Sequence, residues 1–169
     1  MPAVSQSARH ALAATPEFGR DLLTCLSEQP HTIAPKYFYD ATGSRLFDRI
    51  CGLPEYYPTR TELSIFRQHL EHMAALIGPR AEVIEFGAGS LLKARLLLDA
   101  LEAPFGFVAI DISGEHLTAA CSALRRDYPA LEIEAVVADF THPEQLPLRR
   151  SSRSRRVGFF PGSTIGNFS

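Results

Sequence analysis

Apolar residues in the second half of the chain follow two alternating patterns. Short, nearly continuous apolar runs such as AEVIEF and FGFVAI predict buried strands, whereas longer segments with apolar residues at every third or fourth position predict helices. The predicted order is strand 82–86, helix 90–102, strand 106–110, helix 113–127, strand 131–137, a loop or short helix near 142–147, and strand 156–161. This regular alternation predicts an α/β fold with a parallel sheet and right-handed crossover connections.

The first part of the chain consists of predicted helices joined by loops. They lie at about residues 18–28, 44–51 and 61–77. In the last of them, Leu63, Phe66 and Leu70 recur at spacings of three and four, which is typical of a helix face packed on a core. Gly78-Pro79 ends this helix. We therefore predict a helical N-terminal subdomain over residues 1–78 and an α/β domain with a parallel sheet over residues 79–169.

Composition and charge narrow the class of protein. Of the 169 residues, 46% are hydrophobic and 21% are charged, as expected of one globular domain with a core. A formal net charge of −2 gives no general attraction to nucleic acid or to an anionic membrane. No apolar run approaches the roughly 18 residues of a membrane-spanning helix, and the N-terminus lacks the pattern of a secretory signal. We expect a cytoplasmic protein whose partner is a small molecule, not a nucleic acid or a membrane.

One segment favours nucleic acid against this general picture. The arginine-rich run RRSSRSRR spans residues 149–156, where its guanidinium groups could contact phosphates. The chain has no overall basic charge, and no aromatic residues are interleaved with these arginines. A solvated loop before the fourth strand is the preferred interpretation.

Cysteine and histidine do not indicate a metal site or a disulfide framework. Cys25, Cys51 and Cys121 are widely spaced and form no Cys-x-x-Cys, so we expect buried free thiols. His69 and His72 lie three residues apart on a predicted helix, but the sequence around them offers no third ligand. We interpret them as exposed histidines and predict no metal cofactor.

Residues 84–101, IEFGAGSLLKARLLLDAL, pass from an apolar strand through two glycines into a helix. In open parallel sheets, ligands bind beyond the carboxyl ends of the strands. Acidic residues lie at three such ends: Glu85 near the end of the first strand, Asp111 after the second, and Asp139 after the third. The corner between the first strand and its helix is therefore the predicted ligand site.

The residues at this corner favour S-adenosylmethionine over a dinucleotide. Leu92 stands where Gly-x-Gly-x-x-Gly has its third glycine, which argues against a bound pyrophosphate and against a glycine-loop oxidoreductase. An acid after the second strand suits ribose hydroxyls, an acid followed by an aromatic residue suits adenine, and a lysine in the helix suits a carboxylate. The predicted cofactor-binding residues are Gly87, Lys93, Asp111, Asp139 and Phe140. The structural alternative is that the glycines only form a tight turn and that Asp111 caps the next helix.

Two further segments carry a resemblance to a known family. They are KYFYDATGSRLFDRICGLPEYYPTRTE at residues 36–62 and GFFPGSTIGNFS at residues 158–169. With the glycine corner between them, they resemble the histidine-specific N-alpha-methyltransferases of ergothioneine biosynthesis over roughly residues 35–169. The resemblance implies a Rossmann-like class I methyltransferase fold, with S-adenosylmethionine as methyl donor and no metal. It also implies successive methyl transfers to the alpha-amino nitrogen of histidine, which give hercynine.

The same resemblance implies roles for individual residues. The five predicted cofactor-binding residues match the family's cofactor-binding positions, and Tyr56 and Asn167 match substrate-binding positions. Tyr39 matches a tyrosine near the reacting amine, so Tyr39 and Asn167 are the candidate catalytic residues. The structural alternative is that these tyrosines pack within the helical subdomain and that Asn167 caps the next element. We interpret Tyr57 as structural.

The resemblance stops soon after the fourth predicted strand. The family's further substrate-binding segments have no counterpart here, and the sheet would be truncated with a parallel edge strand whose polar groups are unpaired. We expect the chain to be a piece of a longer protein; the alternatives are a partner chain that completes the sheet and a remnant without turnover. The alternative functions are an S-adenosylmethionine-binding module and a related methyltransferase with another amino-acid substrate.

Overall fold

A computed structural model describes residues 16–142, 144, 146 and 155–167, apart from the side chains of residues 16, 17, 163 and 167. The chain divides into two compact units, residues 1–38 and 39–169. The helices from residue 41 onward therefore belong to the same unit as the sheet. The functional division that the sequence suggests at residue 78 stays a prediction.

The first unit contains helix α2 (Pro16–Ser27) and the 3-10 helix η1 (Pro35–Phe38). Tyr37 joins them, because its ring meets Phe18 edge-on at a centroid distance of 4.6 Å and its hydroxyl donates to Asp21 at 2.5 Å. The sequence predicted α2 to within two residues. It did not predict η1, since a single turn is too short to show a periodic pattern.

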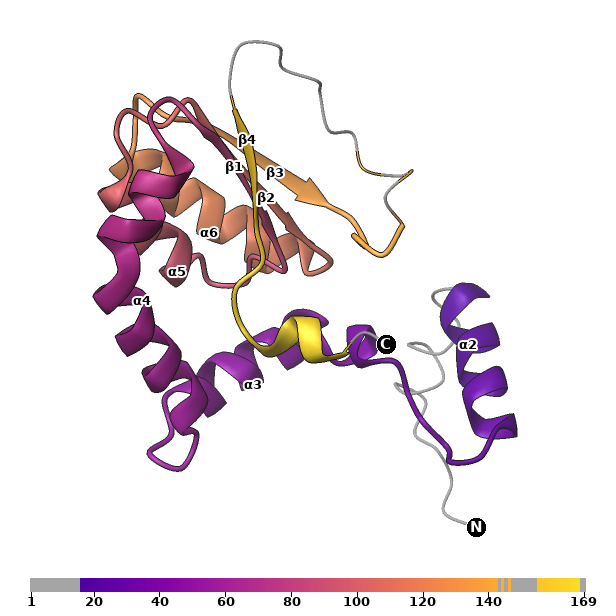
Figure 1. Cartoon of the computed structure of the whole chain (residues 1–169). Coiled ribbons are helices and arrows are strands. Elements are labelled where there is room, and N and C mark those ends of the chain that lie inside the picture. The colour runs from indigo at the N-terminus through magenta and orange to yellow at the C-terminus, as the bar shows by residue number, and fades with distance from the viewer. Residues whose placement is uncertain (1–15, 143, 145, 147–154, 168–169) are drawn as a thin grey trace. The chain divides into compact units, whose positions relative to one another are not determined.

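The second unit is an α/β fold, as predicted (Figure 1). Its elements are α3 (Ala41–Cys51), α4 (Tyr57–Ile77), β1 (Glu82–Phe86), α5 (Leu92–Ala100), β2 (Gly106–Asp111), α6 (Gly114–Asp127), β3 (Glu132–Val137), β4 (Arg156–Phe159) and the 3-10 helix η3 (Ser163–Asn167). All four strands are parallel, in the order β3-β2-β1-β4. Within the described residues β4 pairs with β1 alone, so the predicted parallel edge strand is confirmed. Of the segment near 142–147, residues 143, 145 and 147 lie outside the described part.

Helices α3 and α4 begin three to four residues earlier than predicted. The carboxylate of Asp40 accepts hydrogen bonds from the backbone N–H groups of Thr42 at 3.1 Å and Gly43 at 2.6 Å, which caps α3. Helix α4 has Pro58 in its first turn. A proline is tolerated there because the N–H groups of the first turn have no hydrogen-bond partner within the helix. The prediction missed the first turns of both helices because it used the spacing of apolar residues, which does not detect capping residues or a proline at the helix start.

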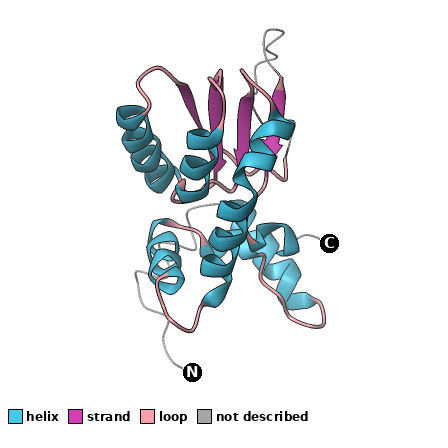
Figure 2. Cartoon of the chain, turned by 60° about the vertical axis from the view of Figure 1, so that its left-hand side comes forward, coloured by secondary structure: helices cyan, strands magenta, loops and turns pink. Residues whose placement is uncertain are grey.

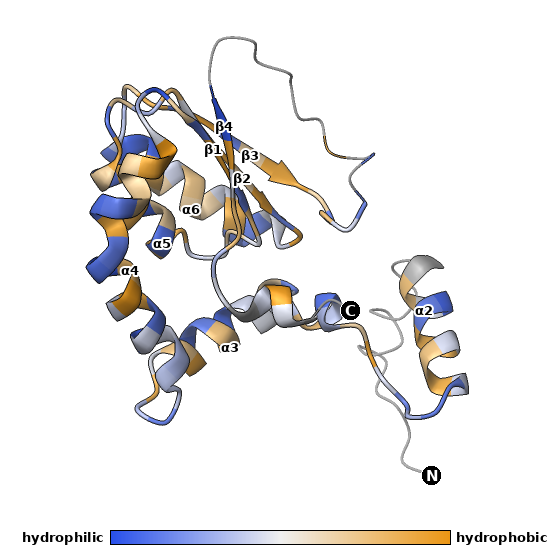
Figure 3. Ribbon diagram, in the orientation of Figure 1, coloured by the Kyte–Doolittle hydropathy of each residue, from blue (hydrophilic) through white to orange (hydrophobic). Residues whose placement is uncertain are grey.

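Side chains of successive strand residues point to opposite faces of the sheet. Helices α4, α5 and α6 cover one face (Figure 1), and the core there contains Phe66, Leu97, Leu117, Val83, Phe107, Ala109, Ile133 and Phe159. A second apolar cluster on the other face contains Ile84, Val108, Ile110 and Val136, with Phe86 and Phe140 packed against it. The hydropathy colouring in Figure 3 shows the central strands as largely apolar, which fits burial on both faces.

Two further segments, α3 and η3, lie at the carboxyl ends of the strands. In Figure 1, α3 and η3 lie beyond the ends at which β1 and β4 finish, and Figure 2 shows the strands of the sheet side by side from another direction. A hydrogen bond of 3.1 Å between the hydroxyls of Ser44 and Ser113 ties α3 to the residue that precedes α6. The two segments that resemble the family thus flank the predicted ligand site.

Candidate functional site

The glycine corner between β1 and α5 depends on backbone conformations that suit glycine. Gly87 has φ 70° and Gly89 has φ 52°, both in the left-handed region. The N–H of Gly87 donates to the carbonyl of Ile110 at 2.9 Å, which ties the corner to β2. A Cβ added at Gly89 would meet no heavy atom within 4 Å, so this part of the corner faces open space. The glycines do form a tight turn, and the turn leaves room for a ligand.

Asp111 fixes this corner through both of its carboxylate oxygens. Oδ2 accepts from the N–H of Gly89 at 3.0 Å, and Oδ1 accepts from the N–H of Ser113 at 2.8 Å. Asp111 therefore has a structural role, but it does not cap α6 as the alternative interpretation proposed, because Ser113 is the cap residue and no side chain caps that helix. A carboxylate has about four acceptor positions, so two remain for the hydroxyls of a ligand. The structural and ligand-binding interpretations of Asp111 are compatible.

Lys93 lies in the first turn of α5 and pairs with a residue that the sequence analysis missed. Its ammonium is 3.0 Å from Oε2 of Glu62 on α4, and both side chains are partly exposed. Oε1 of Glu62 accepts from the N–H of Gly162 at 2.5 Å. Glu62 ends the first family-like segment and Gly162 lies in the second, so one carboxylate joins both segments to the lysine. Glu62 is the last residue of the family-like segment of residues 36–62, but the sequence alone did not show which residues it contacts.

Glu85 lies beneath the corner and not on its open side. Its side chain is only 1% exposed, and Oε2 has no hydrogen-bond partner within the described residues. Burial raises the pKa of Glu85 to about 8; Lys93 opposes this shift, while Asp111 and Glu62 add to it. The expectation that a ligand would meet Glu85 directly is not supported, because the carboxyl group is enclosed and holds a proton at neutral pH.

Asp139 and Phe140 follow the carboxyl end of β3. Oδ1 of Asp139 accepts from the N–H of Thr141 at 2.9 Å, which fixes the turn. The ring of Phe140 meets Phe86 and Phe160 at centroid distances of 5.9 and 5.4 Å. A Cβ placed on the corner glycine, Gly87, would lie 3.8 Å from the Phe140 ring. The structure therefore brings the predicted aromatic residue against the glycine corner.

Tyr39 and Tyr56 are brought together by Phe47, which the sequence analysis did not single out. The Phe47 ring meets Tyr39 edge-on at 5.9 Å and Tyr56 at 6.1 Å. Burial raises the pKa of the Tyr39 hydroxyl, and Tyr56, Asp111 and Cys51 add to the shift. The hydroxyl of Tyr39 is therefore neutral and able to donate. Tyr57, which we expected to pack, is 67% exposed, so that interpretation was wrong.

Asn167 is the last residue of η3, and its side chain lies outside the described part of the structure. Its predicted contact with substrate stays a prediction. The loop that leads to η3 is nevertheless placed at the corner, because Thr164 lies 3.7 Å from the position of a Cβ on Gly87. Residues 163–167 thus start from the edge of the predicted ligand site.

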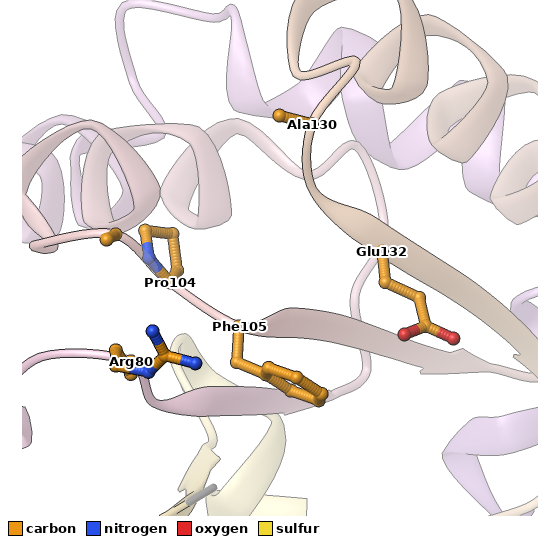
Figure 4. A pocket seen from close by; sticks show the side chains of 6 residues that line it. Arg80, Pro104, Phe105, Ala130 and Glu132 are labelled. Carbon is orange, nitrogen blue, oxygen red and sulfur yellow. The ribbon is translucent and has the colours of Figure 1, made fainter. Parts of the chain in front are cut away.

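A pocket of about 340 Å³ lies at the opposite end of the sheet from the corner (Figure 4). It is lined by Arg80, Ala103, Pro104, Phe105, Ala130 and Glu132. Arg80, Phe105 and Glu132 lie at or just before the amino ends of β1, β2 and β3, whereas the predicted site lies at the carboxyl ends. We therefore separate this pocket from the candidate site.

The predictions about metals, thiols and membranes concern residues outside the glycine corner. Among the described residues, no group of three histidine, cysteine or acidic side chains is close enough to hold a metal ion, and no helix is long and apolar enough to cross a membrane. His69 and His72 are exposed, as predicted. All three cysteines are free, but only Cys121 is buried; Cys25 and Cys51 are partly exposed, so the prediction of burial was wrong for them.

The arginine-rich run lies largely outside the described residues, which resume at Arg155. Arg156 is the first residue of β4, and its Nε lies 2.6 Å from Oε2 of Glu82 on β1. The two atoms form an ion pair without an aligned hydrogen bond. At least this arginine supports the pairing of two strands.

The parallel sheet, the glycine corner and the acids at its strand ends define a Rossmann-like α/β domain. The chain belongs to the family described as histidine-specific methyltransferase, SAM-dependent, whose model matches residues 18–169. The predicted resemblance to this family is confirmed, and so is the Rossmann-like α/β fold that it implied.

Curated relatives match most of this chain and only part of their own length. The chain is 42% identical over 152 residues to the histidine N-alpha-methyltransferase of Mycolicibacterium smegmatis, which covers 88% of this chain and 46% of that protein. It is 30% identical over 143 residues to ergothioneine biosynthesis protein 1 of Neurospora crassa, covering 82% of this chain and 16% of that protein. It is also 30% identical over 120 residues to a 4-dimethylallyltryptophan N-methyltransferase of Claviceps purpurea, covering 69% of this chain and 34% of that protein. The chain thus spans about half the length of the mycobacterial relative.

Proposed function

We propose that this chain holds S-adenosylmethionine at its glycine corner and forms part of an N-methyltransferase that acts on the alpha-amino group of histidine. The product would be hercynine, in the first step of ergothioneine biosynthesis. The family match over residues 18–169 supports the reaction class. The observation that carries the binding site is the open corner at Gly89, whose N–H is fixed by Asp111.

The residues of the corner fit the parts of this cofactor. We assign the ribose hydroxyls to the two remaining acceptor positions of Asp111. The adenine ring would lie beside Phe140 and Asp139, because Phe140 already lies against the corner. The amino-acid tail would lie at Gly87, with its carboxylate near Lys93, whose ammonium has hydrogens left after its contact with Glu62.

The substrate side of the proposal rests on the aromatic group of Tyr39, Phe47 and Tyr56. When bound, the cofactor supplies a methyl group on a positive sulfur, already activated for attack by a neutral amine. The protein has to position that amine, admit it in its neutral form and let its proton leave. A neutral Tyr39 hydroxyl can hold the amine, Tyr56 and Asn167 would hold the substrate, and aromatic rings stabilise the growing positive charge.

Two alternative functions would use the same site. The relative named for 4-dimethylallyltryptophan suggests that another amino acid can be the substrate of this fold. A cofactor-binding domain without turnover of its own is the second, since the chain spans about half of its mycobacterial relative. In both, the partner is a small molecule and the protein has no role with nucleic acid or membrane. A cytoplasmic location stays a prediction from the sequence.

Calorimetric titration with S-adenosylhomocysteine, followed by histidine in the same cell, tests the proposal. Binding of both ligands would support a cofactor and substrate site within this chain. Binding of the first ligand alone would place the substrate contacts in sequence beyond this chain. Binding of neither would refute a cofactor site formed by these residues. Glu71→Gln, at an exposed position on α4, is a matched control for variants of the acidic residues.

A further inference from the structure

Two buried hydroxyls connect parts of the unit that are far apart in sequence. Ser44, in the first turn of α3, is 8% exposed, and Ser113, just before α6, is 5% exposed. Their oxygens lie 3.1 Å apart and form a hydrogen bond across 69 residues of sequence. Apart from Glu85, these two serines are the buried polar side chains of the described residues. Neither belongs to the residues assigned above to cofactor or substrate.

Each serine is also joined to one side of the candidate site. The N–H of Ser113 donates to Asp111 at 2.8 Å, and the other oxygen of Asp111 accepts from the N–H of Gly89. On the other side, the Ser44 hydroxyl lies 3.4 Å from the carbonyl oxygen of Tyr39, a long contact. The N–H of Ser44 donates to the carbonyl of Asp40 at 2.9 Å. A continuous path therefore runs from the glycine corner to the backbone of Tyr39.

Helix α3 also carries Phe47, the ring that touches both Tyr39 and Tyr56. The position of α3 thus sets the position of the aromatic group. Helix α3 also contacts the start of α6 through Asp48 and His116, whose charged atoms lie 3.7 Å apart on partly exposed side chains. Within the described contacts, the bond between Ser44 and Ser113 is the buried link, and it reaches the residue whose N–H donates to Asp111. Because this link is buried, water does not readily replace it when it is broken.

We propose that Ser44 and Ser113 are positioning residues that couple occupancy of the cofactor corner to the order of α3 and its aromatic group. This inference rests on the proposed function, because it uses Asp111 as a cofactor contact. A ligand that binds Asp111 holds the loop at Ser113, and the loop then holds α3 through Ser44. Binding of the cofactor accordingly prepares the aromatic group for the amine. Coupling of this kind is reciprocal, so substrate tightens cofactor binding by the same factor.

A plain packing role for the two serines makes a different prediction. If their bond only stabilises the fold, its removal lowers stability and leaves the response of α3 to cofactor unchanged. If it couples the two sides, its removal leaves the corner able to bind while α3 no longer responds. The response of α3 to cofactor therefore distinguishes the two roles.

The experiment measures amide hydrogen exchange over residues 41–51 of the 169-residue chain, with and without S-adenosylhomocysteine. We compare the parent chain with Ser44→Ala, Ser113→Ala and the double variant. Ser122→Ala is the control, because it removes an exposed hydroxyl from α6 that bonds only within its own helix, to Thr118 at 2.8 Å. In the parent and the control, the ligand should slow exchange in α3 by about fivefold, as expected for one buried hydrogen bond.

In Ser44→Ala and Ser113→Ala the ligand should still bind, but the slowing in α3 should disappear, and the double variant should behave like either single variant. The same slowing in all variants would overturn the inference, as would no slowing in the parent when ligand is bound. Failure of the parent chain to bind S-adenosylhomocysteine would refute the proposed function itself, and the coupling with it. If histidine also binds, it should increase the affinity for the cofactor, and the factor of this increase should be about fivefold smaller in the serine variants.

Discussion

Replacing Glu85 with glutamine should stabilise the fold at alkaline pH and change its stability little at acidic pH. The Glu85 side chain is enclosed under the glycine corner, and burial raises its pKa from 4.5 to about 8. The folded chain therefore keeps a proton on Glu85 that the unfolded chain releases. Because the folded state binds more protons, the free energy of unfolding falls as the pH rises from 4.5 and levels off above about 8.

The size of this effect follows from the difference between the two pKa values. Each pH unit in the interval removes about 1.4 kcal/mol, so the whole interval corresponds to at most about 5 kcal/mol. Glutamine has nearly the same shape as the protonated carboxyl group and carries no charge at any pH. The difference in free energy of unfolding between Glu85→Gln and the parent should therefore grow with pH and be largest above about pH 8.

Urea unfolding followed by far-ultraviolet circular dichroism at several pH values measures this difference. Glu71→Gln removes a carboxylate from the exposed surface of α4, and its difference from the parent should stay within about 0.5 kcal/mol at every pH. A Glu85→Gln difference that is the same at about pH 5 and about pH 8 would refute the reasoning. It would mean that Glu85 is ionised in the folded protein and has a partner for its charge.

Three further variants test the candidate site. Asp111→Ala should weaken S-adenosylhomocysteine binding by at least about tenfold, because it removes the acceptor that orders the corner as well as the proposed ribose contact; an unchanged affinity in calorimetry would sink the ribose assignment. Asn167→Ala should weaken histidine binding and spare the cofactor, and equal losses of both affinities would instead indicate misfolding. Gly162→Ala should weaken cofactor binding several-fold, because φ there is 87° and the added Cβ would lie 3.0 Å from Nζ of Lys93. Gly166→Ala, where a Cβ meets no atom within 4 Å, is its control, and equal affinities for the two variants would contradict the role of Lys93.

The strands could be predicted because burial on both faces makes each central strand a short, mostly apolar run. Residues 82–86 and 106–110 show this pattern, and the structure confirms both as parallel strands; their pairing with each other is a finding of the structure. The corner was also predictable, since glycines with positive φ follow directly after the first strand. These features are local in sequence, so a pattern of a few residues contains them.

Contacts between distant segments could not be predicted in this way. Phe47 touches Tyr39 and Tyr56 because α3 places its ring between them, and no spacing in the sequence distinguishes it from the neighbouring apolar residues. The bond between Ser44 and Ser113 likewise joins residues 69 positions apart. Serine is common in loops and at helix starts, so its type gave no signal at either position. Packing, and not local pattern, assembles this part of the site.

Lys93, which the sequence suggested as a partner for a ligand carboxylate, lies near two carboxyl groups of the protein itself. Its ammonium lies 3.0 Å from Glu62 and lowers the pKa of Glu85, so one positive charge serves two carboxyl groups. The more deeply buried group, Glu85, keeps its proton, and Glu62 keeps the ion pair. An ammonium has three hydrogens, so a ligand carboxylate can join Glu62 at Lys93 without displacing it. Because Glu62 is also held by the N–H of Gly162, it keeps the lysine beside the loop that leads to η3.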